Sequence, residues 1–411
     1  MGLTEILDLV YSELSLSENV DRNPDIGEII KGEYKEIWRI DTEVGMGSFQ
    51  RDVELQLAFD EFFPYTIPRI YLSKRSFEEI YPIPHLDKNR FICTYRDETT
   101  ILDVNKPFEI VTVFIQKAKK IIKEGLENVN SSDFKDELKA YWTDSGGDEF
   151  CYYLSLLNDF PYTTTSLKVF KLRYPFNGIK KIVFKSESDI TVKRLFKYLK
   201  SKGYTGDEYD ALFIPDFKLG LKPPYPSTNE NILQHLSDMS RVAFKKYINL
   251  RDLEKTVFFM GETLNEPILL GWEHKKIKTK RNGFRNNYLT PYRVLSTIQK
   301  QDIIKKIIVE EYNNKRVEQR TTGIIQDKLT FLVAGLGSIG SNLVYFLNGF
   351  NHPNFKLVDA DFLKIENIGR HLLGVDNVNT YKVDAIQNYI KDIRPDQNVS
   401  VKKSTIETVI N

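Results

Sequence analysis

Three glycines with the spacing G-x-G-x-x-G follow a short apolar run near the end of the sequence. They are Gly335, Gly337 and Gly340, in the stretch FLVAGLGSIGSNL. Glycines allow a tight turn and a close approach of the backbone to a phosphate. The N-terminus of a following helix then offers N–H donors and the positive end of its dipole to the anion. The motif predicts a nucleotide site, although a glycine turn at an ordinary strand–helix junction would read the same.

Charged side chains follow the end of the next apolar run, in VDADFLKIENIGR. Asp359 stands 24 residues after Gly335, where a carboxylate can accept hydrogen bonds from ribose hydroxyls. This much is equally typical of a dehydrogenase. Nucleotidyl transfer also needs cations, because it spreads charge over the α-phosphate and the leaving pyrophosphate. Singly, Arg370 and Lys382 are equally explained as solvated helix-face residues. The candidate cofactor-binding residues are Gly335, Gly337, Gly340, Asp359, Asp361, Asn367, Arg370 and Lys382.

The stretch VDADFLKIENIGRHLL…YKVDA resembles the D-x-D-x5-N-x-x-R…K signature of the ThiF-type adenylating fold, over about residues 315–411. Ubiquitin-activating enzymes and enzymes that activate sulfur-carrier proteins share this fold. The resemblance implies that Mg²⁺ and ATP are used to adenylate the C-terminal glycine of a ubiquitin-like carrier. It assigns ribose binding to Asp359, and phosphate binding to Asn367, Arg370 and Lys382.

Members of that family continue to a Mg²⁺-binding aspartate and often to a catalytic cysteine. We expect both to lie beyond Asn411, so no metal ligand is predicted within the chain. The chain is expected to be a fragment that holds half of an adenylation site and is inactive in adenylation by itself.

Cys93 lies in PHLDKNRFICTYRDE, after two apolar residues. A thiolate both attacks and leaves well, so it can pass an acyl group between proteins by transthioesterification. A buried structural cysteine is the alternative interpretation. Basic residues close in the sequence are expected to favour the thiolate; they are Lys88, Arg90 and Arg96.

The same stretch resembles the His-Pro-Asn…Ile-Cys active-site segment of ubiquitin-conjugating enzymes, over about residues 1–130. The resemblance implies that Cys93 carries the acyl group. His85 is expected to support the loop by hydrogen bonding rather than to act as a general base, and Leu86 stands where that family has asparagine. Cys151, in the aromatic run EFCYYLSLL, is expected to be buried and structural.

Hydrophobic periodicity divides the chain into three units that would position these residues. Residues 1–132 combine two alternating strands with a helix at 107–126, which indicates an α+β unit. Residues 133–312 are dense in aromatic residues and are predicted to form an α+β spacer domain. The stretch 305–323 is read as helical. Residues 313–411 have the β-Gly-loop-α-β-α-β order of a doubly wound sheet.

The expected fold class is therefore a multidomain α+β and α/β protein. It would have a ubiquitin-conjugating-like α+β fold, a spacer domain and an incomplete Rossmann-like adenylation fold of the ThiF type.

Composition excludes several other classes. The 58 basic and 57 acidic residues give a net charge of +1, so nucleic acid and acidic lipid are not expected partners. The basic stretch 275–293 is read as a solvated face. Apolar runs fall short of the roughly 18 residues of a membrane span. Two cysteines cannot build a disulfide framework or a thiolate zinc site, and a cytoplasmic protein is expected.

The order of the three units resembles one bacterial family, the Cap-type fusion proteins of cyclic-oligonucleotide antiphage signalling systems (CBASS). The resemblance implies that the carrier is a cGAS/DncV-like nucleotidyltransferase, which is transferred to lysines of target proteins. It also implies a homodimer in which an arginine such as Arg316 or Arg320 reaches the partner's ATP. A NAD-dependent Rossmann oxidoreductase and a non-catalytic partner-binding scaffold remain open as alternatives.

Overall fold

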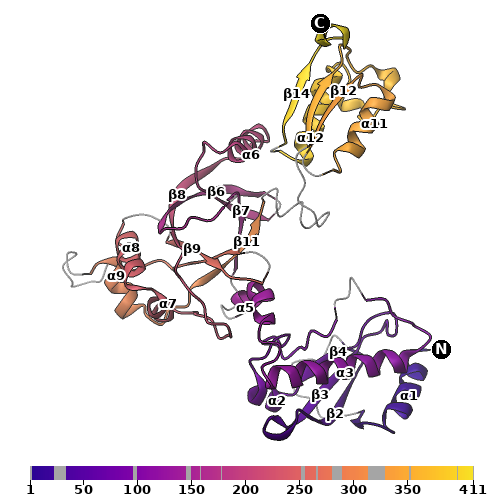
Figure 1. The fold of residues 1–411 in the computed structure, drawn as a ribbon, viewed down its shortest axis with the longest axis vertical. Coiled ribbons are helices and arrows are strands. Elements are labelled where there is room, and N and C mark those ends of the chain that lie inside the picture. Colours follow the sequence, from indigo (N-terminus) through magenta and orange to yellow (C-terminus); the bar gives the residue numbers. More distant parts are fainter. Residues whose placement is uncertain are drawn as a thin grey trace.

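The fold is known from a computed structural model, in which three units follow one another along the long axis of the molecule (Figure 1). Within the residues that it describes, no helix combines the length and apolar character needed to cross a membrane. The described residues are 2–22, 34–95, 100–144, 150–157, 159–176, 178–250, 255–264, 267–279, 289–312, 329–350, 353–395 and 397–410.

The first unit is an antiparallel meander of four strands in the order β1-β2-β3-β4, covered by helices. Ile40 pairs with Leu55, and Leu57 pairs with Ile70, so alternate side chains enter one core. The predicted helix at 107–126 is confirmed as α3, which buries one apolar face in this core. The elements are α1 (Leu3–Leu14), β1 (Asn19–Asp21), β2 (Glu36–Val44), η1 (Gly47–Phe49), β3 (Arg51–Phe59), β4 (Arg69–Leu72), α2 (Lys74–Ile80) and α3 (Pro107–Leu126).

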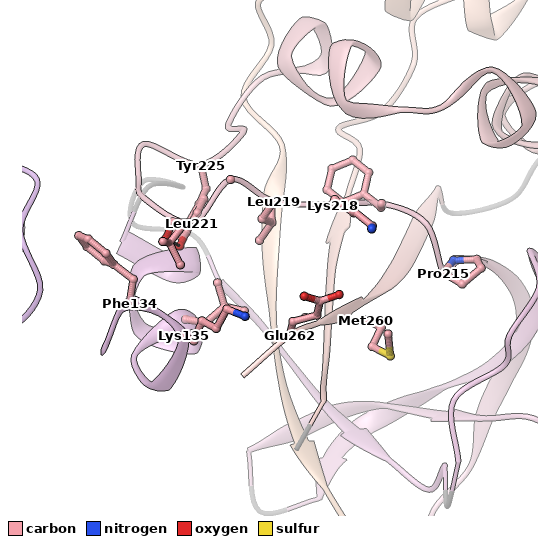
Figure 2. A pocket seen from close by; sticks show the side chains of 13 residues that line it. Phe134, Lys135, Pro215, Lys218, Leu219, Leu221, Tyr225, Met260 and Glu262 are labelled. Carbon is pink, nitrogen blue, oxygen red and sulfur yellow. Dashed lines mark hydrogen bonds between the residues drawn. The ribbon is translucent and has the colours of Figure 1, made fainter. Parts of the chain in front are cut away.

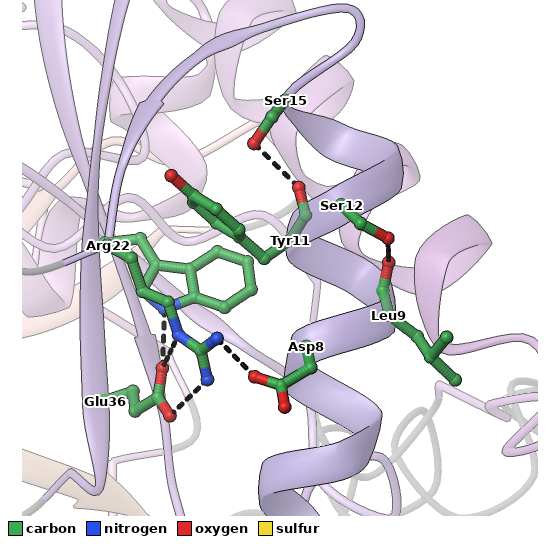
Figure 3. A network of polar contacts seen from close by, with 8 residues as sticks. Asp8, Leu9, Tyr11, Ser12, Ser15, Arg22 and Glu36 are labelled. Atoms are coloured by element: carbon green, nitrogen blue, oxygen red, sulfur yellow. Dashed lines mark hydrogen bonds and ion pairs between the residues drawn. The ribbon is translucent and has the colours of Figure 1, made fainter.

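Arg22 attaches α1 to this sheet (Figure 3). Its Nε and Nη2 atoms donate to the two carboxylate oxygens of Glu36 at 2.7 and 2.8 Å, and Nη1 donates to Asp8. The guanidinium also lies 5.7 Å from the ring centroids of Tyr11 and Trp38. These hydrogen bonds, the strongest to Glu36, raise the pKa of Arg22 and lower that of Glu36. The two-pronged contact thus fixes Arg22 on β2, and its contacts with Asp8 and Tyr11 join α1 to the sheet.

The second unit contains a closed barrel of seven strands in the order β10-β11-β5-β7-β6-β8-β9, with β9 pairing to β10. Its interior is filled by side chains such as Tyr153, Leu167, Val183, Phe213 and Phe258. Helix α6 covers one side of the barrel wall, and α5, α7 and α8 cover another. The elements are α4 (Asp133–Asp136), α5 (Leu138–Asp144), β5 (Phe150–Ser155), β6 (Thr165–Phe176), β7 (Ile179–Phe184), α6 (Ile190–Ser201), β8 (Gly206–Ile214), α7 (Asn229–His235), α8 (Asp238–Ile248), β9 (Thr256–Gly261), β10 (Ile268–Glu273), α9 (Pro291–Arg293), η3 (Val294–Ile298) and β11 (Lys305–Glu311).

The helical interpretation of 305–323 is wrong over its first part, because residues 305–311 form strand β11. This strand pairs parallel to β5 and antiparallel to β10, and it buries Ile307 and Val309 in the barrel. The long-range pairing overrides a local pattern rich in lysine and glutamate. Residues 313–328, which include Arg316 and Arg320, lie outside the described residues.

The third unit is a parallel sheet in the order β12-β13-β14, with α11 and α12 as crossover helices. The predicted β-Gly-loop-α-β-α-β order is confirmed. Among the described residues, the polar contacts between this unit and α6 of the barrel unit include Lys202 with Asp392 at 3.0 Å and a hydrogen bond from Arg194 to Asn398 at 3.1 Å. The elements are β12 (Thr330–Ala334), α11 (Ser338–Leu347), β13 (Asn354–Val358), η4 (Ile365–Asn367), η5 (Val375–Asn377), α12 (Lys382–Ile393), β14 (Val399–Lys402) and α13 (Glu407–Ile410).

Candidate functional site

The glycine loop links the end of β12 to the start of α11. Gly335 has φ of +80°, a left-handed conformation, and its N–H donates to Val358 at 2.8 Å. A Cβ on Gly340 would lie 1.8 Å from the carbonyl oxygen of Gly335, so only glycine lets α11 pack on the loop. Gly337 has no side chain with which to cap the first N–H groups of α11. A Cβ placed there would meet no heavy atom of the described residues within 4 Å. The loop therefore suits a bound anion.

Asp359 lies beneath this loop, where β13 ends. Its Oδ2 accepts the N–H of Leu336 at 2.6 Å, its Oδ1 accepts the N–H of Asp361 at 2.8 Å, and its side chain is only 8% exposed. Asp359 thus holds the loop in shape through backbone hydrogen bonds. Its predicted contact with ribose remains a prediction.

Lys382, the first residue of α12, reaches the same place. Its Nζ lies 2.9 Å from Oδ2 of Asp361 and 3.9 Å from Oδ1 of Asp359. The lysine side chain is buried, whereas that of Asp361 is 71% exposed. The buried ammonium of Lys382 is therefore paired with an exposed carboxylate, which a phosphate oxygen could replace as its partner.

Asn367 and Arg370 lie at and just after η4, in a segment that contacts the first turns of α11. Oδ1 of Asn367 accepts the N–H of Lys364 at 2.9 Å, and its carbonyl accepts the N–H of Arg370 at 3.0 Å. The carbonyl of Arg370 accepts from Oγ of Ser338 at 3.1 Å and from Nδ2 of Asn342 at 3.2 Å. These bonds hold the backbone of Arg370 at the N-terminus of α11, with an exposed side chain.

His371 was missed in the sequence, although it directly follows Arg370 and is one of only five histidines. Its Nε2 lies 2.8 Å from the carbonyl oxygen of Leu336, and its Nδ1 accepts the N–H of Leu373 at 3.0 Å. The ring is therefore neutral with its proton on Nε2, and burial lowers its pKa. His371 joins the segment of Arg370 to the glycine loop.

All eight candidate residues thus gather at the carboxyl ends of β12 and β13, where ligands bind in doubly wound sheets. Across the described ranges, no three or more His, Cys, Asp and Glu side chains gather to hold a metal ion. The described part of this site thus combines the backbone N–H groups at the start of α11 with the cationic side chains of Lys382 and Arg370.

Cys93 lies in the first unit, in a loop beside β4. Its N–H donates to the carbonyl of His85 at 2.8 Å, and its side chain is partly exposed. The imidazole of His85 lies 2.7 Å from Glu137 and 3.2 Å from Asp133, and the hydrogen bond to Glu137 raises its pKa. This geometry agrees with a supporting role for His85. Of the predicted basic neighbours, Lys88 is exposed and Arg90 is buried, and Arg96 lies outside the described residues.

Cys151 lies in the barrel interior. Its Sγ donates to Glu273 at 3.3 Å, and the same carboxylate bonds to Tyr153 and Lys181. Burial, together with the charge of Glu273, raises the pKa of Cys151 to about 11. The thiol is therefore protonated near neutral pH and unsuited to nucleophilic attack. Neither Cys93 nor Cys151 is part of a disulfide.

A pocket of about 170 Å³ lies within the second unit, between α4 and the segment that follows β8, and none of the candidate residues lines it (Figure 2). Phe134 and Leu138 line it from the helical side, and Phe217, Leu219 and Tyr225 line it from the barrel side. It is mainly apolar. None of the candidate cofactor-binding residues contributes to it.

The two ends of the chain match different protein families. Residues 322–409 match the ThiF family, and residues 32–150 match prokaryotic E2 family B. The C-terminal unit is a ThiF domain. This domain contains all eight candidate cofactor-binding residues, and the match to prokaryotic E2 family B contains Cys93 and His85.

The chain also shares local similarity with several solved structures. TcdA (CsdL) is 25% identical over 19% of this chain and 31% of its own, with a TM-score of 0.19. E. coli tRNA N6-threonylcarbamoyladenosine dehydratase, TcdA, in complex with ATP is 23% identical over 23% of this chain and 39% of its own (TM-score 0.20). E. coli MccB with MccA-N7isoASN is 21% identical over 23% of this chain and 26% of its own (TM-score 0.19). The chain thus spans well under half the length of these structures. No curated protein matches the chain.

Proposed function

We propose that this polypeptide is part of a conjugation enzyme that uses ATP to adenylate the C-terminal carboxylate of a carrier protein. The carrier is then passed through a thioester on Cys93 to lysines of target proteins. One observation carries the proposal: a single chain joins a ThiF domain that contains the glycine loop to a match with prokaryotic E2 family B that includes a partly exposed cysteine.

In the ThiF domain, ATP would supply an activated α-phosphate and pyrophosphate as the leaving group, with Mg²⁺ accompanying the phosphates. The open space at Gly337 and the uncapped N–H groups of α11 fit a phosphate. Lys382 can exchange the exposed Asp361 for a phosphate oxygen, and Arg370 lies at the same helix end. These residues bind and orient the triphosphate and offset its charge.

In the first unit, the thiolate of Cys93 attacks the carbonyl carbon of the activated carrier. A carbon–sulfur bond forms to Cys93 as the bond to the donor group breaks, and the donor leaves with the electron pair. Attack by a lysine amine of the target then forms an amide and regenerates the thiol. His85 does not serve as the base, because both ring nitrogens already face carboxylates.

The resemblance to CBASS fusion proteins supports a specific carrier, a cGAS/DncV-like nucleotidyltransferase with a C-terminal glycine. We accordingly propose a role in the cytoplasm of a bacterial cell during antiphage defence. We also propose a homodimer formed through the ThiF domain, which a monomeric mass by light scattering of a polypeptide with a whole ThiF domain would contradict.

Nucleotide specificity tests the proposal directly. The chain should bind a fluorescent ATP analogue, and unlabelled ATP should displace the analogue far better than NAD. A polypeptide that includes a whole ThiF domain should exchange pyrophosphate into ATP only when the carrier is present. Preferential binding of NAD would favour an oxidoreductase. Binding of neither nucleotide would favour a partner-binding scaffold.

A further inference from the structure

The turn that joins α4 to α5 has two chemically different faces. Phe134 and Leu138 are buried in the core of the barrel unit. Asp133 and Glu137, which are also four positions apart, face His85 of the Cys93 loop instead. The match to prokaryotic E2 family B extends to residue 150 and so includes this turn. The turn is therefore attached to the barrel unit by apolar packing and to the Cys93 loop by the contacts of its two carboxylates with His85.

Glu137 holds both the backbone and the ring of His85. Its Oε2 accepts the N–H of His85 at 3.1 Å, and its Oε1 lies 2.7 Å from Nδ1. Oδ2 of Asp133 lies 3.2 Å from Nε2. All of these contacts are satisfied at once only when both ring nitrogens carry a proton, so the arrangement suits an imidazolium between two carboxylates.

His85 needs this support because its φ is +64°, a left-handed conformation that is unfavourable for a residue with a Cβ. Its carbonyl oxygen accepts the N–H of Cys93 at 2.8 Å. The chain of contacts therefore runs from the carboxylate of Glu137 through the strained residue His85 to the backbone of Cys93. Tyr141, on α5, lies close to the same turn and donates to the carbonyl of Ile83 at 3.4 Å.

We propose that Glu137, assisted by Asp133, is a positioning residue for acyl transfer at Cys93, so that the interdomain turn forms part of the thioester site. This inference rests on the proposed function of Cys93. Cys93 would be held correctly only while the turn is docked and His85 is protonated. The charged groups that reach the ring are Glu137 and Asp133, and the neighbouring phenol of Tyr141 stays neutral because burial raises its pKa.

The pH dependence of the contact between Glu137 and His85 follows from the raised pKa of His85. Glu137 raises the pKa of His85, so the contact is intact at pH values below the ordinary histidine range and is lost as pH rises through the raised pKa. A ring that has lost one proton can no longer donate to both carboxylates. The hold on Cys93 should then weaken without any change in sequence.

The test uses the full chain with Cys151→Ala, so that Cys93 is the only thiol. Glu137→Gln keeps the shape of the side chain and removes its charge, and Asp133→Asn does the same at the longer contact. Asp136→Asn is the matched control, because this exposed carboxylate belongs to the same helix. Three properties are measured: the pKa of His85 by NMR, hydrogen exchange of the Cys93 amide, and acylation of Cys93 by a synthetic glycyl thioester of 2-mercaptoethanesulfonate. In that reaction Cys93 displaces the small thiol, which takes up the proton released by Cys93.

We expect Glu137→Gln to lower the pKa of His85, because the carboxylate that raises it is removed. At about pH 6 it should speed exchange of the Cys93 amide, and slow acylation, by at least about tenfold each, with smaller effects of Asp133→Asn. Asp136→Asn should match the wild type. The difference should shrink as pH rises above the pKa of His85, because the wild type then loses the same contact.

Unchanged amide exchange and acylation in Glu137→Gln, despite a lowered pKa of His85, would overturn the inference. An equal effect of Asp136→Asn would also overturn it, because the effect would then be one of general helix charge. Faster amide exchange in Glu137→Gln, with no acylation of Cys93 in any variant, would uphold the positioning contact and reject the proposed function. Equal acylation of Cys93 in all variants would reject the positioning role of Glu137 and leave the proposed function of Cys93 standing.

Discussion

Nε2 of His371 donates to the carbonyl oxygen of Leu336 at 2.8 Å, and Asp359 accepts the N–H of the same residue, so both backbone groups of Leu336 in the glycine loop are held by side chains. Removing the ring in His371→Ala would leave a buried carbonyl without its donor. We expect the free energy of unfolding of the ThiF domain to fall by about 1–3 kcal/mol, measured by denaturant-dependent hydrogen exchange of that domain. His235→Ala, at an exposed histidine of α7, is the control and should change little.

The stability that His371 confers should also depend on pH. Burial lowers the pKa of His371, so its contribution is fully present above the ordinary histidine pKa and is lost as pH falls through the lowered value. The gap in stability between wild type and His371→Ala should therefore narrow in acid. A gap of constant size would contradict a neutral, buried ring.

Arg370→Ala tests the discrimination of ATP from NAD. The backbone of Arg370 is fixed at the N-terminus of α11, and its exposed guanidinium is available to a phosphate. In a polypeptide with a whole ThiF domain, carrier-dependent exchange of pyrophosphate into ATP should fall at least about 100-fold, which is about 3 kcal/mol of lost charge stabilisation. Lys364→Ala, at an exposed lysine of the same segment, should retain exchange. Full exchange by Arg370→Ala would remove this residue from the site.

We expect Cys93, and not Cys151, to carry the acyl group. With ATP, the carrier and a whole ThiF domain, an adduct that thiols cleave should form on Cys93 and disappear in Cys93→Ala. Cys93→Ser should form an adduct that resists thiols, or none if the hydroxyl attacks too weakly. Cys151→Ala should keep the adduct, because burial and Glu273 hold that thiol protonated. Denaturing gels with and without a reducing agent distinguish these results. An adduct that depends on Cys151 alone would reverse the assignment.

Arg22→Ala tests the attachment of α1 to the sheet. Loss of the two-pronged contact with Glu36 should lower the free energy of unfolding of the first unit by about 1–3 kcal/mol, measured by urea denaturation. Arg39→Ala is the control, because Arg39 makes longer ion pairs at 3.4 Å and is more exposed. Arg22 lowers the pKa of Glu36, so the contribution is present at neutral pH and is lost as pH falls through that lowered value. Equal losses in the two variants would argue against a special role for Arg22.

Local patterns in the sequence predicted the ThiF domain well. The spacing of Gly335, Gly337 and Gly340, and the acidic end of the next strand, are short-range signals that specify a strand, a turn and a helix. The helix α3 was equally clear, because its apolar residues repeat with helical spacing over 20 residues.

The barrel was not predicted, because its closure depends on pairs far apart in the sequence. The local sequence of strand β11 is typical of a charged helix. Its partner β5 lies far away in the sequence, and its partner β10 is separated from it by a long connection. The roles of His371 and Glu137 were missed for a similar reason. Each acts through a contact with a backbone group or ring more than 30 residues away, and a single sequence carries no local signal for such a contact.

The barrel lies between the two chemical centres (Figure 1). The Cys93 loop contacts the turn at one side of this unit, whereas the ThiF domain contacts α6 at another. Within the proposed function, a carrier activated at the glycine loop must span the barrel to reach the thiol of the same chain, or reach a neighbouring chain. An extended tail covers about 3.3–3.6 Å per residue. If the proposed function holds, the barrel would set a minimum tail length: carriers with short C-terminal tails would be delivered between chains, and only carriers with long tails could reach Cys93 of the same chain.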